Sequence, residues 1–399
     1  MAVNVKVGPI GALDMLKFKN MAKVREQAIQ AAPANEITGD FSVNRLAKEF
    51  HPDFLDLKIA EIVEHKDAKT FVFESAGLHK IPYFRAGQYL SLKLPIEGSY
   101  VTRPYSISSG PALTKEGKIA ITVKANPTGF AAEWMLNNFK VGDAVTASAP
   151  EGQFFYENLR DSKNVIALAG GSGITPFLSM AHAIQDGDED FNLTILFGSK
   201  TEADILFKDE LDGIEAACKK VKVVHVLSDE KKEGYENGFI TAELIKKYAA
   251  DDYSIFVCGP EAMYRFVSGE IAKLELPRRK VRNEMLGVTK KVWEQPGFPA
   301  DKKDAKVKLT VKVGENTYNI EAACNEPMLT AIERAGIKAP SRCRSGECGW
   351  CRSKLVSGET FIPEENEFRR YSDKEFGYVH PCCTFALTDA EIEVPGEFF

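Results

Sequence analysis

The chain has 399 residues and a mass of 44.1 kDa, which is too long for one ordinary domain and predicts roughly three. With 44% hydrophobic and 27% charged residues, its composition is that of a soluble globular protein. A net charge of −6 and a pI near 5.7 argue against nucleic acid as a main partner. We expect a cytoplasmic protein without a membrane span, because the first residues lack the order of a signal peptide and glycines interrupt the uncharged stretch 164–185.

Residues 1–54 predict an N-terminal helical extension. Apolar residues at roughly helical spacing predict one helix within residues 15–29, and a second covers Ser42–Phe50 with Ser42 as its N-cap. The extension either packs against the rest of the chain or docks a partner, and both roles stay open.

Residues 55–158 predict a small antiparallel β-barrel. Short runs with period-two alternation and turn residues between them are typical of strands, and six such runs favour a closed six-stranded barrel. The runs are 57–63, 69–73, 88–94, 105–108, 119–124 and 144–148.

The barrel carries the short motif Arg103-Pro-Tyr-Ser106. An arginine can neutralise a phosphate, an aromatic ring can cover a flat heterocycle, and a hydroxyl can bond a ring nitrogen. The tetrapeptide alone is a weak signal, and it gains weight from the motifs around it.

Residues 159–290 predict an α/β domain with a doubly wound parallel sheet. Continuously apolar runs alternate with helical stretches, which is typical of βαβ units. A glycine-rich turn over 170–176 follows the first run, and Cys258-Gly-Pro-Glu261 follows the last. Both belong to the sheet edge where ligands bind, and the turn suits a pyrophosphate. The runs are 165–170, 193–197, 221–227 and 253–257, and the helical stretches are 177–184, 208–218, 242–248 and 261–274.

Residues 291–304 lack periodicity and predict a linker, and residues 305–399 predict an α+β domain of the ubiquitin-roll kind. Within it, Cys343, Cys348 and Cys351 are spaced C-x4-C-x2-C, which with one distant cysteine is the plant-type spacing for a [2Fe–2S] cluster. Disulfides are disfavoured because eight cysteines in 399 residues are too few for a secreted fold that is held together by disulfide bonds. A zinc site is disfavoured because it normally needs two short Cys/His pairs.

As a set, these motifs resemble the ferredoxin–NADP reductase superfamily of flavoproteins. The barrel motif stands among Phe84–Leu90, Ile121–Lys124, Pro127–Ala132 and Pro150–Phe154, in the family's order. A flavin barrel, a nucleotide domain and a C-terminal [2Fe–2S] ferredoxin-like domain follow one another in phthalate dioxygenase reductase-like proteins and in reductase components of several Rieske-type oxygenases. The resemblance covers residues from about 57 to 395.

The resemblance implies roles for individual residues. Arg103 would hold the flavin phosphate, Tyr105 would stack on the isoalloxazine, and Ser106 would lie by the flavin N5. Cys258 and Glu284 would lie beside the nicotinamide, so that Ser106, Cys258 and Glu284 are the predicted catalytic residues; alternatively Glu284 is only a surface residue. The other predicted cofactor contacts are Pro104, Thr122, Lys124, Gly129, Phe130, Gly170, Gly171, Gly173, Thr175, Pro176, Ser199, Lys200, Gly259 and Pro260.

The resemblance also implies that Cys382, rather than its neighbour Cys383, is the fourth cluster ligand. Two departures from the family pattern bear on the flavin. Ala131 and Ala132 stand where many FAD members carry Ser or Thr, so FAD is predicted with FMN as the alternative. Leu286 replaces an aromatic residue, which leaves the stacking role of that position open.

The nucleotide preference depends on the stretch after the second strand of the α/β domain. Ser199 and Lys200 would suit the 2′-phosphate of NADPH, whereas Glu202 would suit the 2′-hydroxyl of NADH. NADH is predicted, with NADPH as the alternative.

The predicted function is an NAD(P)H-dependent oxidoreductase that passes electrons through flavin and a [2Fe–2S] cluster to a partner redox protein such as an oxygenase. The partner would dock near Arg342, Arg344 and Arg352, which flank the cluster loop; alternatively these arginines only tune the cluster or pair within their domain. Two other functions stay open. The chain could relay electrons inside a larger complex without oxidising NAD(P)H, or it could sense redox state through the Cys382-Cys383 pair.

Overall fold

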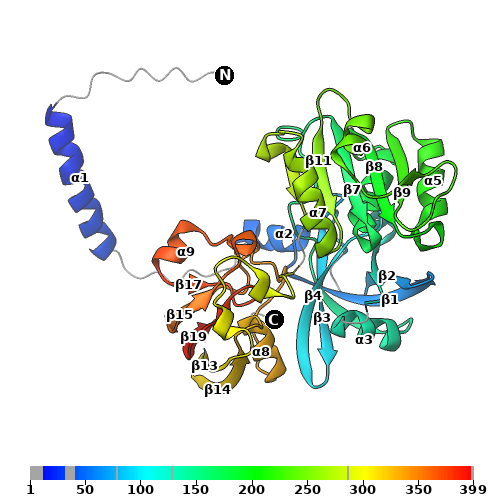
Figure 1. Cartoon of the computed structure of the whole chain (residues 1–399). Coiled ribbons are helices and arrows are strands. Elements are labelled where there is room, and N and C mark those ends of the chain that lie inside the picture. The colour runs from blue at the N-terminus through cyan, green and yellow to red at the C-terminus, as the bar shows by residue number, and fades with distance from the viewer. Residues whose placement is uncertain (1–11, 32–40, 78–79, 127–128, 285–286, 397–399) are drawn as a thin grey trace. The chain divides into compact units, whose positions relative to one another are not determined.

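The computed structural model describes residues 12–31, 41–77, 80–126, 129–284 and 287–396. The chain divides into two units, Met1–Lys48 and Glu49–Phe399, which are described separately. Two helices, α1 (Ala12–Ala31) and α2 (Ser42–Phe50), occupy the N-terminal region, where the helical spacing of apolar residues predicts them (Figure 1). In the described part of the chain, none of the helices has the length and apolar character needed to cross a membrane.

The larger unit begins with an antiparallel six-stranded sheet in the order β4-β3-β6-β1-β2-β5. A bridge between Ile107 and Ile121 joins the two ends of this order, which closes the sheet on itself. Alternate residues of β1 and β2 point into the interior, and helix α3 adds buried side chains to the same core. The elements are β1 (Phe54–Glu64), β2 (Ala68–Ser75), β3 (Tyr89–Ile96), β4 (Ser99–Ser106), β5 (Lys118–Lys124), α3 (Phe130–Asn138) and β6 (Ala144–Ser148).

Strand β4 is longer than the sequence predicts. It begins at Ser99 rather than at Tyr105, because β3 and β4 form a tight hairpin. Glu97 and Gly98 form the turn with φ of 50° and 79°, the left-handed values that two-residue hairpins need. Pro104 lies inside the strand, and a proline argues against a strand when only the sequence is considered. It is tolerated here because β4 stands at one end of the strand order.

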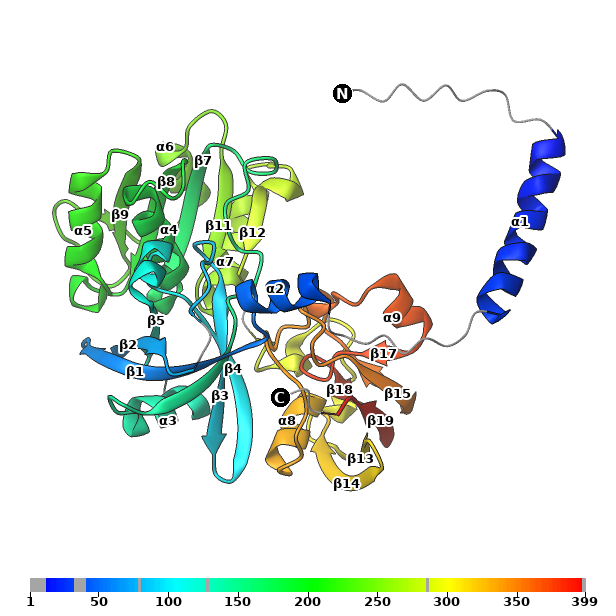
Figure 2. The same cartoon turned by 180° about the vertical axis from the view of Figure 1, so that it is seen from behind.

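The second domain has a wholly parallel sheet in the order β10-β9-β8-β7-β11-β12 (Figure 2). Successive residues of β7 face opposite sides: Val165 packs with the core that contains α4 and α5, and Ile166 packs with the core that contains α6 and α7. This arrangement confirms the predicted doubly wound domain. Its elements are β7 (Asn164–Gly170), α4 (Thr175–Gln185), β8 (Asn192–Ser199), α5 (Lys208–Ala217), β9 (Val221–Leu227), β10 (Glu236–Asn237), α6 (Ala242–Tyr248), β11 (Ser254–Cys258), α7 (Glu261–Ala272) and β12 (Val281–Asn283).

The C-terminal domain combines a five-stranded mixed sheet, in the order β14-β13-β19-β15-β17, with helix α8 packed on it. Strands β16 and β18 form a second, two-stranded sheet. The cysteine loop, residues 340–352, lies between α8 and β15. The elements are β13 (Lys306–Val313), β14 (Asn316–Ala323), α8 (Met328–Arg334), β15 (Ser353–Ser357), β16 (Thr360–Phe361), α9 (Tyr371–Glu375), β17 (Tyr378–Val379), β18 (Phe385–Ala386) and β19 (Ala390–Val394).

The predicted linker at 291–304 is packed rather than loose. It contains two short 3-10 turns, Val292–Glu294 and Ala300–Lys302. Val292 and Phe298 are buried and share a small core with Phe385 of the C-terminal domain. This segment therefore holds the C-terminal domain through apolar contacts.

Candidate functional site

A cleft of about 920 Å³ lies between the barrel, the carboxyl edge of the parallel sheet and the segment that leads into the C-terminal domain. Most of the predicted cofactor contacts line it. These are Pro104, Tyr105, Ser106, Thr122, Lys124, Gly170, Gly171, Gly173, Thr175, Cys258, Gly259, Pro260 and Glu284. Six predicted contacts do not line it: Arg103, Gly129, Phe130, Pro176, Ser199 and Lys200.

The barrel wall of the cleft presents an aromatic ring and a set of hydroxyl groups. Burial raises the pKa of Tyr105 to about 12, so this ring stays neutral. Ser106 is buried one position further along β4. Thr122 on β5 donates a hydrogen bond to Ser108 at 3.0 Å and shares one with Thr70 at 2.8 Å, which fixes its side chain. This wall suits a flat heterocycle with polar edges.

The opposite wall is the glycine-rich turn after β7. Gly173 lies against the end of β11, where a Cβ would stand 2.1 Å from the carbonyl oxygen of Cys258. No side chain fits there, so the glycine lets the turn and β11 approach each other closely. Thr175 is the first residue of α4, and its hydroxyl donates to the Ser172 carbonyl at 3.0 Å.

Cys258 ends β11, Glu284 directly follows the neighbouring β12, and both line the cleft. The Glu284 amide donates to the Val257 carbonyl at 2.9 Å, which places the two residues side by side. Burial raises the pKa of the Cys258 thiol and of the Glu284 carboxyl, with the charges of Glu347 and Cys343 adding to the effect at Glu284. Glu284 Oε1 has no hydrogen-bond partner, so a neutral acid is available to a ligand.

Arg103 faces away from this cleft. Its guanidinium lies 3.8 Å from the Glu333 carboxylate on α8, and burial lowers its pKa to about 10. The predicted flavin-phosphate contact is therefore held at the junction between the barrel and the C-terminal domain.

Four other predicted contacts lie at the ends of elements outside the cleft. Gly129 and Phe130 begin α3, whereas Ser199 ends β8 with Lys200 after it.

Three of the four predicted cluster ligands lie in the cysteine loop, and Cys382 lies beside it. The Cys343 thiol is close to those of Cys348 and Cys382, and the Cys382 thiol is also close to those of Cys351 and Cys383. Hydrogen bonds from Cys348 and Cys382 lower the pKa of Cys343, which favours its thiolate. No group of three His, Cys, Asp or Glu within the described ranges could hold a single metal ion. A two-iron cluster does not need one, because each iron takes two thiolates.

Backbone N–H groups point at the sulfur atoms. The amides of Ser345 and Cys348 donate to Cys343 Sγ at 3.5 and 3.4 Å, and the Trp350 amide donates to Cys348 Sγ at 3.4 Å. Gly346 permits this winding with φ of 89°. Such donors stabilise thiolates, so the loop fits a [2Fe–2S] cluster.

Cys383 lies beside Cys382, and its thiol also contacts backbone oxygens. Its thiol lies 3.5 Å from the His380 carbonyl and 3.7 Å from the Asn366 carbonyl, where it donates to backbone oxygen. The imidazole of His380 in turn contacts the Gly346 carbonyl at 2.7 Å, which ties the cysteine loop to the segment that carries both cysteines.

The three arginines predicted to lie near the docking site for an acceptor differ in exposure. The side chains of Arg342 and Arg344 are only 9% and 11% exposed and point toward the barrel side of their domain. Arg352 is 43% exposed and pairs with Asp373. The carboxylates of Glu151 and Glu333 already hold these two guanidinium groups, and docking of an acceptor near them stays a prediction.

Several cleft residues escape sequence reasoning. Tyr264 on α7 lies within hydrogen-bonding distance of the carbonyls of Val257 and Glu284. Thr289 and Gln295 come from the packed segment before the C-terminal domain, and Glu365 comes from that domain itself. Only Tyr264 had a local signal, as an aromatic residue in the first turn of the helix that follows Cys258. Leu286 lies outside the described residues.

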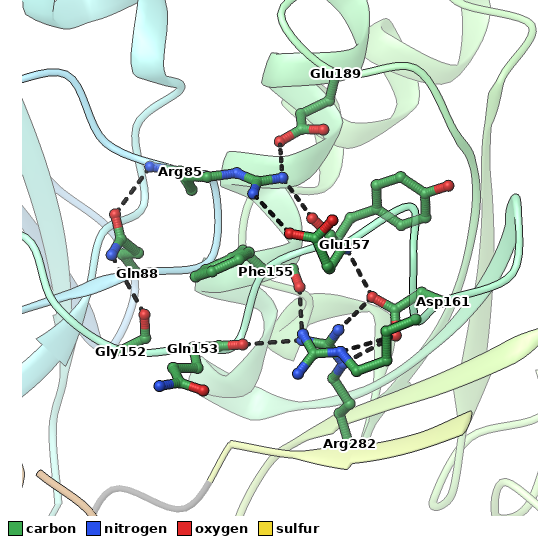
Figure 3. Close-up of polar contacts among 11 residues, drawn as sticks. Arg85, Gln88, Gly152, Gln153, Phe155, Glu157, Asp161, Glu189 and Arg282 are labelled. Atoms are coloured by element: carbon green, nitrogen blue, oxygen red, sulfur yellow. Dashed lines mark hydrogen bonds and ion pairs between the residues drawn. The ribbon is translucent and has the colours of Figure 1, made fainter. Parts of the chain in front are cut away.

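A buried ion pair holds the segment that joins the barrel to the α/β domain (Figure 3). Arg282 on β12 donates to both carboxylate oxygens of Asp161, and its Nη1 donates to the carbonyls of Gln153 and Phe155 at 2.9 and 2.7 Å. From the barrel side, Arg85 lies over the Phe155 ring at 4.4 Å. Arg282 stands two residues before Glu284, so this pair supports the strand that presents the buried acid.

Comparison with known proteins agrees with this architecture. Three family models match: an oxidoreductase FAD-binding domain over residues 56–156, an oxidoreductase NAD-binding domain over 167–269, and a 2Fe-2S iron-sulfur cluster binding domain over 311–387.

Relatives match over most of the chain. A glycine betaine monooxygenase reductase subunit from Chromohalobacter salexigens is 27% identical and covers 83% of this chain and 93% of its own. The ferredoxin reductase component of 3-ketosteroid-9-alpha-monooxygenase from Mycobacterium tuberculosis is 29% identical, covering 82% and 92%. The solved phthalate dioxygenase reductase shares the fold with a TM-score of 0.61 and 24% identity, covering 86% of this chain and 98% of that one. The chain thus carries FAD-binding, NAD-binding and 2Fe-2S domains in one order, and in this it resembles the flavoproteins of the ferredoxin–NADP reductase superfamily that have a C-terminal plant-type [2Fe–2S] domain.

Proposed function

We propose that this chain oxidises NADH and passes the electrons through FAD and a [2Fe–2S] cluster to a separate redox protein. The observation that carries the proposal is the convergence of three elements on one place. The cleft joins the Tyr105 wall of the barrel to the Cys258 and Glu284 edge of the sheet. Glu365 of the C-terminal domain lines the same cleft.

Each wall of the cleft has a separate task. Tyr105 and Ser106 orient the flavin ring, and the turn from Gly170 to Thr175 holds the pyrophosphate of the nucleotide on backbone amides. The neutral Glu284 acid and the Cys258 thiol line the place for the nicotinamide without adding negative charge. When bound, the flavin accepts two electrons as hydride, and the cluster takes them one at a time.

The partner is inferred from the relatives. The two named above are reductase components of monooxygenases, and they match this chain over nearly their whole length. We therefore propose an oxygenase component as the acceptor. Cys348 is the exposed cluster ligand, and it marks the side of the loop that a partner can approach.

Anaerobic titration of the purified holoprotein with NADH tests the function. We expect NADH at low concentration to bleach both the flavin bands and the broader iron–sulfur bands. Dithionite serves as the control, because it reduces both centres without using the nucleotide site. Bleaching by dithionite but not by NADH or NADPH would show that the chain only relays electrons.

The preference for NADH has a test at Glu202. Its carboxylate holds both Lys232 and the Tyr235 hydroxyl, two further groups that could otherwise bind a 2′-phosphate. Glu202→Gln removes the charge, and we expect the ratio of kcat/KM for NADPH over NADH to rise by about tenfold, roughly 1.4 kcal/mol. Glu236→Gln is the matched control, because Glu236 holds Lys247 and Tyr248 in the same way. An unchanged ratio in Glu202→Gln would remove Glu202 from nucleotide selection.

A further inference from the structure

Two arginines flank the first cluster ligand, Cys343, and both are buried where the ferredoxin domain contacts the barrel. The Arg342 guanidinium pairs with Glu151 and donates to the Asp53 carbonyl at 3.0 Å. Glu151 lies just after β6 and Asp53 just before β1, so both partners belong to the barrel domain. The same guanidinium lies 3.4 Å from the centre of the Trp350 ring, inside the cysteine loop. Arg342 therefore joins the loop to the barrel on one side of Cys343.

Arg344 makes the second connection. It donates to the Glu333 carboxylate at 2.5 Å, and the other oxygen of that carboxylate lies 3.8 Å from Arg103 on β4. The Ser99 hydroxyl, also on β4, donates to the Glu333 carbonyl at 2.7 Å. Arg344 has φ of 58°, a left-handed value that is unfavourable for a residue with a side chain. Arg344 therefore makes its ion pair with Glu333 from this unfavourable backbone conformation, on the other side of Cys343 from Arg342.

These contacts differ from ordinary surface ion pairs. The side chains of Arg342, Arg344 and Glu333 are 9%, 11% and 6% exposed, so their charges are stabilised by oppositely charged partners rather than by water. Removing one partner leaves another buried charge without compensation. A domain that moved away from the barrel would expose all of these groups, so the contacts favour one docked position.

We propose that Arg342 and Arg344 are positioning residues that lock the cysteine loop onto the barrel and thereby set the distance for electron transfer from flavin to cluster. The inference rests on the proposed function for its kinetic consequence. Electron transfer between two centres slows steeply as their separation grows, so a loosened loop lowers this step without changing the reaction of NADH with flavin. In each transfer the reduced flavin loses one electron and the oxidised cluster gains it.

Arg342→Gln is the main variant, and Arg352→Gln is its matched control. Arg352 has the same kind of partners, the Asp373 carboxylate and the Tyr378 ring at 3.5 Å, but both lie within the ferredoxin domain. Glu151→Gln is a second variant, which weakens the contact from the barrel side without changing the cysteine loop. It separates the positioning role from a direct effect of Arg342 on the cluster, and it serves if Arg342→Gln fails to fold.

The experiment follows the loaded proteins after anaerobic mixing with NADH, and it records flavin and cluster bleaching separately. In Arg342→Gln and Glu151→Gln we expect flavin bleaching at the wild-type rate and cluster bleaching slowed by roughly tenfold or more. Arg352→Gln should match the wild type in both steps. Equal cluster bleaching in all four proteins would overturn the inference.

Limited proteolysis of the same proteins gives a readout that does not depend on turnover. We expect faster cleavage around residues 287–304 in Arg342→Gln and Glu151→Gln, because release of the loop loosens the packed segment before the ferredoxin domain. The EPR spectrum of the dithionite-reduced cluster should remain that of the wild type. If NADH fails to bleach the wild-type flavin, the proposed function fails, and the cleavage rates alone then decide the positioning role. Unchanged cleavage in both variants would exclude it.

Discussion

Replacing Cys382 with alanine should abolish the iron–sulfur cluster, whereas the same replacement at Cys383 should leave it in place. The Cys382 thiol lies close to those of Cys343 and Cys351 and to that of its neighbour Cys383, and the Cys383 thiol donates to backbone carbonyls. Because four thiolates hold the two irons, loss of one ligand removes the cluster rather than weakening it. Iron content per chain, the visible absorbance of the cluster and the EPR signal after dithionite reduction measure the result.

The pair of variants is closely matched, since the two cysteines are adjacent and both buried. Any general effect of removing a buried thiol appears in both proteins. Flavin absorbance should be retained in both, because the barrel does not include this segment. Loss of the cluster in Cys383→Ala with retention in Cys382→Ala would reverse the ligand assignment, and loss in both would indicate that the segment must be intact for assembly.

Sequence patterns were most informative where the chemistry is local. The cysteine loop is a run of 13 residues, 340–352, whose spacing already fixes which cluster it suits. The parallel sheet was also readable, because each buried strand is a continuous apolar run followed by an amphipathic helix. The turn after β7 needed its glycines for close approach to β11, and that need is visible as a glycine-rich stretch.

Long-range pairing was not readable in the same way. Arg342 meets Glu151, which lies 191 residues earlier, and the Asp53 carbonyl, which lies 289 residues earlier. Within the sequence, Arg342 stands in a basic stretch, which favours a surface for an acidic partner. The burial of that stretch depends on docking between two domains, and no local periodicity encodes it. Pro104 likewise concealed the first part of β4 from the sequence prediction. A proline is acceptable in a strand at the end of a sheet, and the place of β4 in the sheet is not visible in the sequence.

Asp161→Asn should lower the free energy of unfolding by about 3–5 kcal/mol, because it leaves the buried Arg282 guanidinium without a counter-charge. The Asp161 side chain is fully buried and that of Arg282 is 8% exposed. Urea denaturation of the apoprotein, followed by tryptophan fluorescence, measures the change. Glu321→Gln is the control, because its pair with Lys306 is more than half exposed on both sides and should contribute at most about 1 kcal/mol. A loss no larger than in this control would show that the pair is not desolvated in solution.

The double variant Asp161→Leu with Arg282→Met separates stability from positioning. Apolar side chains of similar size remove both buried charges, so stability should recover to within about 1–2 kcal/mol of the wild type. The carbonyls of Gln153 and Phe155 nevertheless lose their donor, and β12 loses its anchor to the segment that enters the α/β domain. Glu284 follows that strand directly, so reduction of the flavin by NADH should remain slower than in the wild type. Recovery of both stability and flavin reduction would mean that the ion pair contributes only to folding. Recovery of stability alone would mean that the buried ion pair serves to orient Glu284 at the proposed nicotinamide site.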